Sequence, residues 1–184
     1  RSERIEMDGS VLREALLKTV IAAEVSDLRP EISGVLFSIE PSELKVVATD
    51  SFRLAEATVS GKQIKNTFKK GVQITIPLKA AQELSRVVGD KDRVSFSANE
   101  TQALFSSENL ELVTRVIEGR FPDYQAIVPK EIETEVVVNR EDLINGLKLA
   151  GSFSGKAGEV KLNVKDKKIL EISASDSSIG KNKY

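Results

Sequence analysis

The chain has 184 residues with a formal net charge of −1, and 40% of the residues are hydrophobic and 30% charged, which is typical of a folded globular protein rather than a disordered one. It contains neither cysteine nor histidine, which excludes disulfides, thiol nucleophiles, His-based triads and the usual zinc sites. The sequence has no long apolar run and its first residues, RSER, do not resemble a signal peptide, so we expect a cytoplasmic protein without a membrane partner.

The first third of the chain predicts one helix among short strands. Residues 5–7 alternate apolar and polar side chains, and residues 10–25 carry apolar residues at the three- and four-residue spacing of a helix that Asp8 or Ser10 could cap. Further strands are predicted at residues 33–39, 44–48 and 54–59. Residues 61–71 hold four lysines between two glycines, and we expect an exposed loop there.

The next part predicts a second helix and a second group of strands. A strand at residues 72–76 leads into a helix that begins at Pro77 and ends at Gly89. The apolar side of this helix consists of Ala81, Leu84, Val87 and Val88. Strands follow at residues 93–97, 103–106 and 110–116. Residues 118–124 then break the alternation with turn formers and two aromatic residues, and we interpret them as an anchored connection out of a first domain.

One order of signals occurs twice, at residues 7–51 and 138–177: an alternating strand, a helix, a glycine-containing loop and two short strands. The two copies are offset by roughly 125 to 131 residues, which is the length of a domain. We therefore expect an α+β fold in which each domain packs two helices on antiparallel sheets. Residues 1–130 would form a complete domain and residues 131–184 a truncated second copy, so that the chain is a fragment.

Acidic residues are the remaining candidates for metal or acid-base chemistry. Asp50, Glu118 and Asp123 could converge on a metal ion. However, Asp50 lies at a strand end where Asx turns are common, and the other two lie in a turn around Gly119 and Pro122. The sequence also lacks a calcium-loop motif and a glycine-rich phosphate loop. We therefore predict no catalytic residue, no metal site and no cofactor.

Basic residues lie off the apolar stripes of both predicted helices. Lys79 and Arg86 are seven residues apart and so project from nearly the same helix face, while Arg13 and Lys18 lie on the first helix. Such a face could contact phosphates without reading bases, or it could simply be solvated. The spacing alone leaves both interpretations open.

Large apolar side chains occur in two segments predicted to be irregular. Phe52 and Leu54 lie beside Thr49 and Arg53 directly after a strand, and a second group lies at residues 121–127. Apolar residues in loops either complete a core or line a groove, and the pattern alone does not separate these outcomes.

The same two segments resemble motifs of a known family. Residues 47–55 (VATDSFRLA) and residues 116–124 (VIEGRFPDY), followed by Ile127 and Pro129, are similar in sequence, order and spacing to motifs of the bacterial sliding clamp, the β subunit of DNA polymerase III. The resemblance places residues 1 to about 130 in the middle domain and the rest in the first half of the third domain. It implies a DNA clamp fold, with helices on the inner wall of a ring that two subunits close around duplex DNA.

The resemblance also implies a function and its partners. A sliding clamp catalyses nothing; it slides on duplex DNA as a processivity factor and docks polymerases, clamp loaders and repair proteins through short peptides. By position, the peptide groove would include Ile32, Thr49, Ser51, Phe52, Arg53, Leu54, Pro122 and Ile127. The DNA-facing residues would be Arg29, Lys79 and Arg86. The homodimeric ring would belong to the full-length protein and is not expected for this fragment.

Several positions depart from the family pattern. Pro30 and Glu31 stand where aromatic residues occur, Phe52 stands where histidine is frequent, and Ala126 stands where arginine can occur. These changes affect the expected DNA contact and the peptide preference. The alternative hypothesis is an adaptor or divergent clamp paralogue that binds peptides without encircling DNA.

Overall fold

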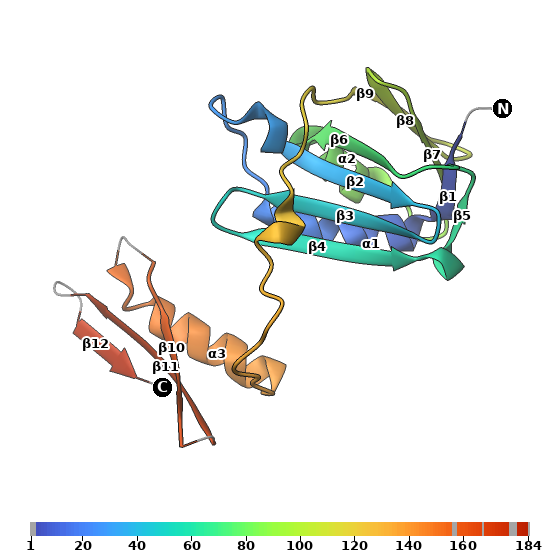
Figure 1. The fold of residues 1–184 in the computed structure, drawn as a ribbon. Helices are drawn as coiled ribbons and strands as arrows, with labels where there is room; N and C mark the ends of the chain where they lie inside the picture. Colours follow the sequence, from blue (N-terminus) through green and yellow to red (C-terminus); the bar gives the residue numbers. More distant parts are fainter. Residues whose placement is uncertain (1–2, 156–157, 167, 177–179, 184) are drawn as a thin grey trace. The chain divides into compact units, whose positions relative to one another are not determined.

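The computed structural model describes residues 3–155, 158–166, 168–176 and 180–183 (Figure 1). The chain divides into two compact units, residues 1–127 and residues 128–184. Among the described residues, none of the helices has the length and apolar character that crossing a membrane requires.

The first unit consists of two antiparallel sheets and two helices. The five-stranded sheet has the order β5-β1-β7-β8-β9, with β1 Ile5–Asp8, β5 Ile64–Asn66, β7 Arg93–Ala98, β8 Gln102–Ser106 and β9 Glu111–Arg115. The four-stranded sheet has the order β4-β3-β2-β6, with β2 Gly34–Glu40, β3 Glu43–Thr49, β4 Leu54–Ser60 and β6 Val72–Pro77. The helices are α1 Gly9–Thr19 and α2 Leu78–Val87. The predicted α+β class, with two helices on antiparallel sheets, is confirmed for this unit.

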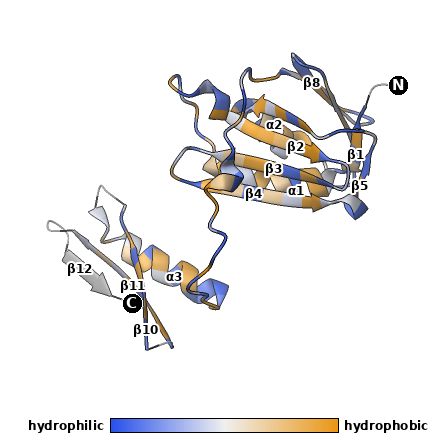
Figure 2. Ribbon diagram, viewed as in Figure 1, coloured by the Kyte–Doolittle hydropathy of each residue, from blue (hydrophilic) through white to orange (hydrophobic). Residues whose placement is uncertain are grey.

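Alternation along the strands sends one side of the four-stranded sheet into a core shared with the helices. Phe37 of β2 meets Phe96 of β7 and Phe105 of β8, with ring centroids 5.2 and 5.6 Å away, so aromatic contacts join the two sheets. Leu12 and Leu16 of α1 are fully buried in the same core, and α1 packs against α2 and β4. Figure 2 shows the hydrophobic character of β2 and β3.

The first predicted helix begins where expected but ends six residues early. α1 ends at Thr19 and continues only as a 3-10 turn, Val20–Ala22. The buried Thr19 donates its hydroxyl to the carbonyl oxygens of Ala15 and Leu16 at 2.9 and 3.2 Å. A run of β-branched residues, Thr19 to Ile21, disfavours further helix, which explains the early end.

Two local predictions in this unit are wrong. Residues 61–71 are not simply an exposed loop, because Ile64–Asn66 forms β5 against β1 and both Ile64 and Phe68 are buried. The lysines of this segment are exposed. Because they dominate its composition, the sequence did not indicate that Ile64 and Phe68 would be buried. Val87 is 41% exposed rather than part of the apolar side of α2, because the helix ends there and Val88 turns inward in an extended conformation.

The second unit repeats part of this order. α3 Arg140–Gly151 precedes an antiparallel sheet of β10 Lys161–Lys165, β11 Ile169–Asp176 and β12 Gly180–Lys183. This sequence of elements matches α1, β2, β3 and β4. Asn139 caps α3 by accepting hydrogen bonds from the backbone N–H groups of Glu141 and Asp142 at 2.8 and 3.3 Å.

One prediction for the second unit differs from the structure. The strand expected before α3, ending near Val138, does not form. Its counterpart β1 is held between β5 and β7, and the described part of the second unit contains no such neighbours. On α3, Ala150 is buried against Ile172 and Ala174, whereas Leu147 is 37% exposed. The predicted strand end at Ser177 lies outside the described residues.

Candidate functional site

The corner between β3 and β4 is held by hydrogen bonds to the Asp50 carboxylate. The backbone N–H groups of Phe52 and Arg53 donate to Oδ1 at 2.9 and 2.6 Å, and Arg53 Nε donates to Oδ2 at 2.9 Å. Thr49 Oγ1 donates to the carbonyl oxygen of Arg53 at 2.7 Å. These contacts compensate for Ser51, whose φ of 77° lies in the left-handed region that favours glycine.

The hydrogen bonds also determine the charge of Asp50. Donation by the Arg53 backbone N–H, followed by the Arg53 side chain, lowers the pKa of this carboxyl to about 2. The Asp50 side chain is 5% exposed, whereas the side chain of Arg53 is 65% exposed. Asp50 is therefore ionised at neutral pH and serves as the structural centre of the corner, while Phe52, 95% exposed, is presented to solvent.

An apolar cluster lies on the side of the four-stranded sheet that faces away from the helices. We name it the Leu54 cluster; it comprises Ile32, Leu36, Val47, Leu54, Phe121 and Tyr124. Leu36 and Val47 are sheet residues, and the segment after β9 crosses them with Phe121 and Tyr124 (Figure 1). The buried aromatic residues complete this second core, whereas Leu54 is only half-buried at its margin.

A partly buried hydrogen bond anchors the crossing segment. The Tyr124 hydroxyl donates to Glu56 Oε2 at 2.6 Å, and the Phe121 and Tyr124 rings meet edge to face with centroids 6.3 Å apart. Burial, assisted by the hydrogen bond to Glu56, raises the pKa of Tyr124 to about 12. The prediction of an anchored connection at residues 118–124 is therefore confirmed.

The structure brings most of the predicted groove residues to one place. Ile32 and Leu54 belong to the Leu54 cluster, Thr49 pairs with Leu54 across the strands, and residues 51–53 form the adjoining corner. Pro122 borders a separate hollow of about 190 Å³ beside Lys45 and Tyr124. Ile127 is 73% exposed and follows the last turn of the crossing segment.

Arg29 lies at the corner as well. Its Nη1 donates to Ser51 Oγ at 2.9 Å and its Nε donates to Glu31 at 3.1 Å. The sequence grouped Arg29 with the DNA-facing residues and gave no signal for this contact across 22 positions. The guanidinium, 47% exposed, therefore borders the candidate peptide site.

The helix cations differ in their partners. Arg86 pairs with Glu83, Arg13 with Asp90 at 2.8 Å, and Lys18 with Glu14 at 2.6 Å. Lys79 is exposed at the start of α2, and no described residue forms an ion pair with it. The two helices thus carry a weak, partly neutralised positive charge.

The acidic residues considered for metal binding do not meet. Across the described ranges, no group of three or more Asp, Glu, His or Cys residues is arranged to hold a metal ion. The Asp50 carboxylate is instead engaged by Phe52 and Arg53.

A family model described as the central domain of the DNA polymerase III beta subunit matches residues 6–123. This chain belongs to the DNA polymerase III beta subunit family. The matched region contains the β3–β4 corner and every member of the Leu54 cluster except Tyr124, which directly follows it. The curated family members that resemble the chain include the "Beta sliding clamp" of Bacillus subtilis, 31% identical over 180 residues, covering 96% of the chain and 47% of that protein.

Solved family structures have the same fold. The chain superposes on the DNA polymerase sliding clamp of B. subtilis with a TM-score of 0.90 and 29% identity, covering all of this chain and 48% of that one. The DNA polymerase III beta subunit of Thermotoga maritima gives a TM-score of 0.88 at 26% identity, with 100% and 50% coverage. The predicted clamp fold is confirmed, and the chain spans about half the length of these relatives.

Proposed function

We propose that the chain is part of a sliding clamp, a non-enzymatic ring that encircles duplex DNA and docks polymerases, clamp loaders and repair proteins through short peptides. Residues 1–130 would be the middle domain of the subunit, and residues 131–184 the first half of its third domain. The names of the relatives support the clamp role, and the role requires no cofactor. The ring would form from two copies of a protein with the full length of those relatives.

The observation that carries the peptide-docking role is the Leu54 cluster and its corner. Leu54 is half-buried and Phe52 is exposed, so the apolar side chain of a peptide would remove both from water. Full burial of one leucine or phenylalanine side chain contributes about 1.5 to 3 kcal/mol. Arg53 and Arg29 border this surface and would orient acidic or carbonyl groups of the peptide.

The proposed contact with DNA is weak because it involves few positive charges. Lys79, Arg86 and Arg29 are the proposed DNA-facing residues, and two of them also pair with acidic side chains. Because a ring holds its partner by enclosure, it needs few phosphate contacts, and a strong grip would stop sliding. The weak positive charge of α1 and α2 suits this role better than that of a sequence-reading protein.

A peptide titration tests the docking role. A fluorescein-labelled pentapeptide, Gln-Leu-Ser-Leu-Phe, would be titrated with the chain and its anisotropy measured. We expect saturable binding that Leu54→Ala weakens about tenfold, the equivalent of about 1.4 kcal/mol. Leu17→Ala is the matched control, because Leu17 is half-exposed on α1, on the opposite side of the sheet. Equal affinities for the Leu54→Ala variant and the unchanged chain would refute the docking role.

A separate experiment tests the ring. In a protein that contains this chain and spans the full length of its relatives, Lys79→Ala with Arg86→Ala should shorten retention on circular DNA. The same substitutions should leave the pentapeptide affinity unchanged. Unchanged retention would favour the adaptor hypothesis over the clamp.

A further inference from the structure

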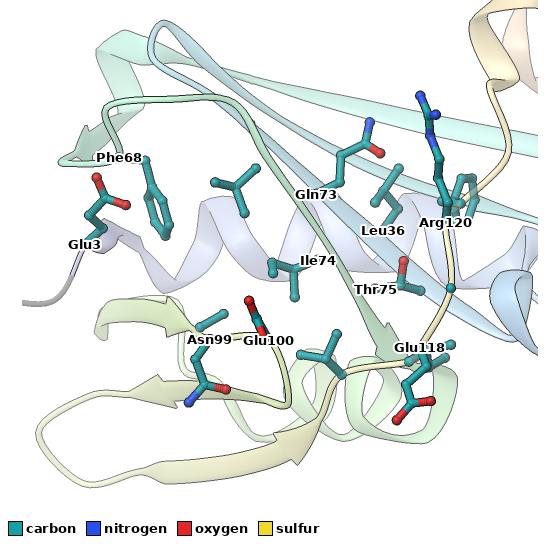
Figure 3. A pocket seen from close by; sticks show the side chains of 16 residues that line it. Glu3, Leu36, Phe68, Gln73, Ile74, Thr75, Asn99, Glu100, Glu118 and Arg120 are labelled. Atoms are coloured by element: carbon teal, nitrogen blue, oxygen red, sulfur yellow. The ribbon is translucent and has the colours of Figure 1, made fainter.

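A second hollow lies on the first unit, beside the open edge of β6. It has a volume of about 640 Å³, within the range of ligand sites. Figure 3 shows its lining side chains along β6, with Glu3 and Phe68 at one end and Glu118 and Arg120 at the other. Leu36 and Phe121 of the Leu54 cluster also line this hollow, but the proposed clamp role uses none of its β6 residues.

The strand β6 offers unpaired main-chain groups to the hollow. In the antiparallel pair with β2, alternate residues direct their N–H and C=O groups toward β2 and away from it. The carbonyl oxygen of Thr75 accepts a hydrogen bond from the Ile117 N–H at 2.8 Å, so Thr75 and, two residues earlier, Gln73 face the open edge. In the part of the chain that the structure describes, Gln73 finds no main-chain partner on this edge. Such an edge is a template for an added strand.

The hydrogen bond from the Ile117 N–H to the Thr75 carbonyl oxygen is already the first contact of such an added strand. Residues 116–121 line one end of the hollow and then turn away over the Leu54 cluster. The edge of β6 from Thr75 toward Val72 therefore remains available. An extended segment of a few residues would continue the pairing in line with Ile117.

The side chains around the hollow indicate which residue types a bound segment would carry. Phe68 and Ile74, both buried, form the apolar floor of the hollow, and Val72 beside them is partly buried. Among the described lining residues, the carboxylates of Glu3, Glu100 and Glu118 outnumber the single guanidinium of Arg120. Glu3 accepts a hydrogen bond from the Lys69 backbone N–H at 3.1 Å. Glu100 and Glu118 are exposed, and the described residues supply neither with an ion-pair partner.

We propose that the β6 hollow binds an extended peptide segment of a partner protein in which a basic residue alternates with an apolar one. The segment adds to the β6 edge through the main-chain groups of Gln73. Because side chains of a strand alternate between its two faces, the apolar residues cover Phe68 and Ile74 while the basic residues meet Glu100 and Glu118.

The probe is a capped, fluorescein-labelled hexapeptide of alternating lysine and valine, and a peptide of alternating glutamate and valine is the control. The chain should bind the lysine peptide saturably at low salt and should not bind the glutamate peptide. Glu100→Gln with Glu118→Gln should weaken the binding and reduce its salt dependence. Absence of saturable binding, or equal binding of both peptides, overturns the proposal.

The variant Gln73→Pro tests the strand addition directly. Proline removes the N–H on the open edge, while the pairing with β2 does not use that group, so an edge strand tolerates it. We expect Gln73→Pro to bind the lysine peptide about three to ten times more weakly, since one hydrogen bond is lost. Gln73→Ala keeps the N–H and should therefore bind the lysine peptide more tightly than Gln73→Pro does. Equal affinities for Gln73→Pro and Gln73→Ala contradict the proposal.

A measurement on the unchanged chain covers the case in which Gln73→Pro does not fold, as checked by circular dichroism. Amide hydrogen exchange at Gln73 should slow when the lysine peptide is added, and an unchanged exchange rate overturns the proposal. The Gln-Leu-Ser-Leu-Phe titration with Leu54→Ala reports on the Leu54 cluster alone. The two proposals therefore fail or stand separately.

Discussion

Arg29 donates a hydrogen bond to Ser51 Oγ at 2.9 Å, which ties the loop before β2 to the corner between β3 and β4. Arg29 was expected to face DNA and Ser51 to bind peptides. The Arg29 side chain thus lies where the proposed DNA contact and the proposed peptide contact meet. Ser51 needs such support because it adopts a left-handed conformation without being glycine.

Arg29→Ala should loosen the corner while leaving the fold almost unchanged. Its guanidinium is half-exposed, so we expect the free energy of unfolding to fall by at most about 1 kcal/mol. Amide exchange of Ser51 and Phe52 should become faster. Urea denaturation and hydrogen exchange measured by NMR would check both effects. A corner that exchanges as slowly as before would show that the contact does not support Ser51.

The corner should persist to unusually low pH. Hydrogen bonds from Arg53 lower the pKa of Asp50 from 3.8 to about 2, so the folded state favours the carboxylate. The stability that this provides is fully present above about pH 4 and is lost as the pH falls through about 2. An NMR titration of the Phe52 and Arg53 amide protons should show an inflection near pH 2. An inflection at the ordinary aspartate value would contradict the role given to Asp50.

Tyr124 should titrate late in alkali. Its pKa is raised from 10.0 to about 12, so folding favours the neutral phenol. This contribution is complete below about pH 10 and is lost as the pH rises toward 12. Tyrosinate absorbance, measured in a Tyr184→Phe background that leaves Tyr124 as the only tyrosine, would give its pKa. An ordinary value of 10 would mean that Tyr124 is not held against Glu56.

Two phenylalanine substitutions should distinguish a core position from a surface position by their effect on the free energy of unfolding. Phe96 is fully buried between Phe37 and Phe105, so Phe96→Ala should lower the free energy of unfolding by about 3 to 5 kcal/mol. Phe52 is 95% exposed, so Phe52→Ala should change it by less than about 0.5 kcal/mol. Urea unfolding of both variants provides the comparison. A large loss for Phe52→Ala would place that side chain in the core.

Most elements could be predicted because each of them buries apolar residues, on one face of the helices and on both faces of the central strands β2 and β3. Residues 33–39 and 44–48 are largely apolar and flank a turn at residues 40–43, and the structure forms β2 and β3 there with small shifts at the ends. Local sequence patterns did not predict the structure where strand pairing or position in the fold decides it. Ile64 becomes a strand residue because β1 needs a second neighbour, and the stretch before α3 stays irregular in the described residues because no such neighbours are present.

The candidate site was only partly readable from the sequence. The motif resemblance located Thr49, Leu54 and Ile32, which lie together, and it grouped Pro122 with them; Pro122 borders a hollow that Phe121 and Tyr124 of the Leu54 cluster also line. The partner of Arg29 could not be predicted, because a hydrogen bond across 22 positions leaves no local pattern. The β6 hollow was missed because an open strand edge is a property of sheet order rather than of residue type.

NMR shift mapping with the Gln-Leu-Ser-Leu-Phe peptide tests the central claim most directly, because it locates the contact as well as detecting it. We expect saturable shifts concentrated at the backbone amides of residues 49–54 and at Ile32 and Phe121. Shifts confined to β6, or no shifts at all, would contradict the assignment of the Leu54 cluster as the docking site.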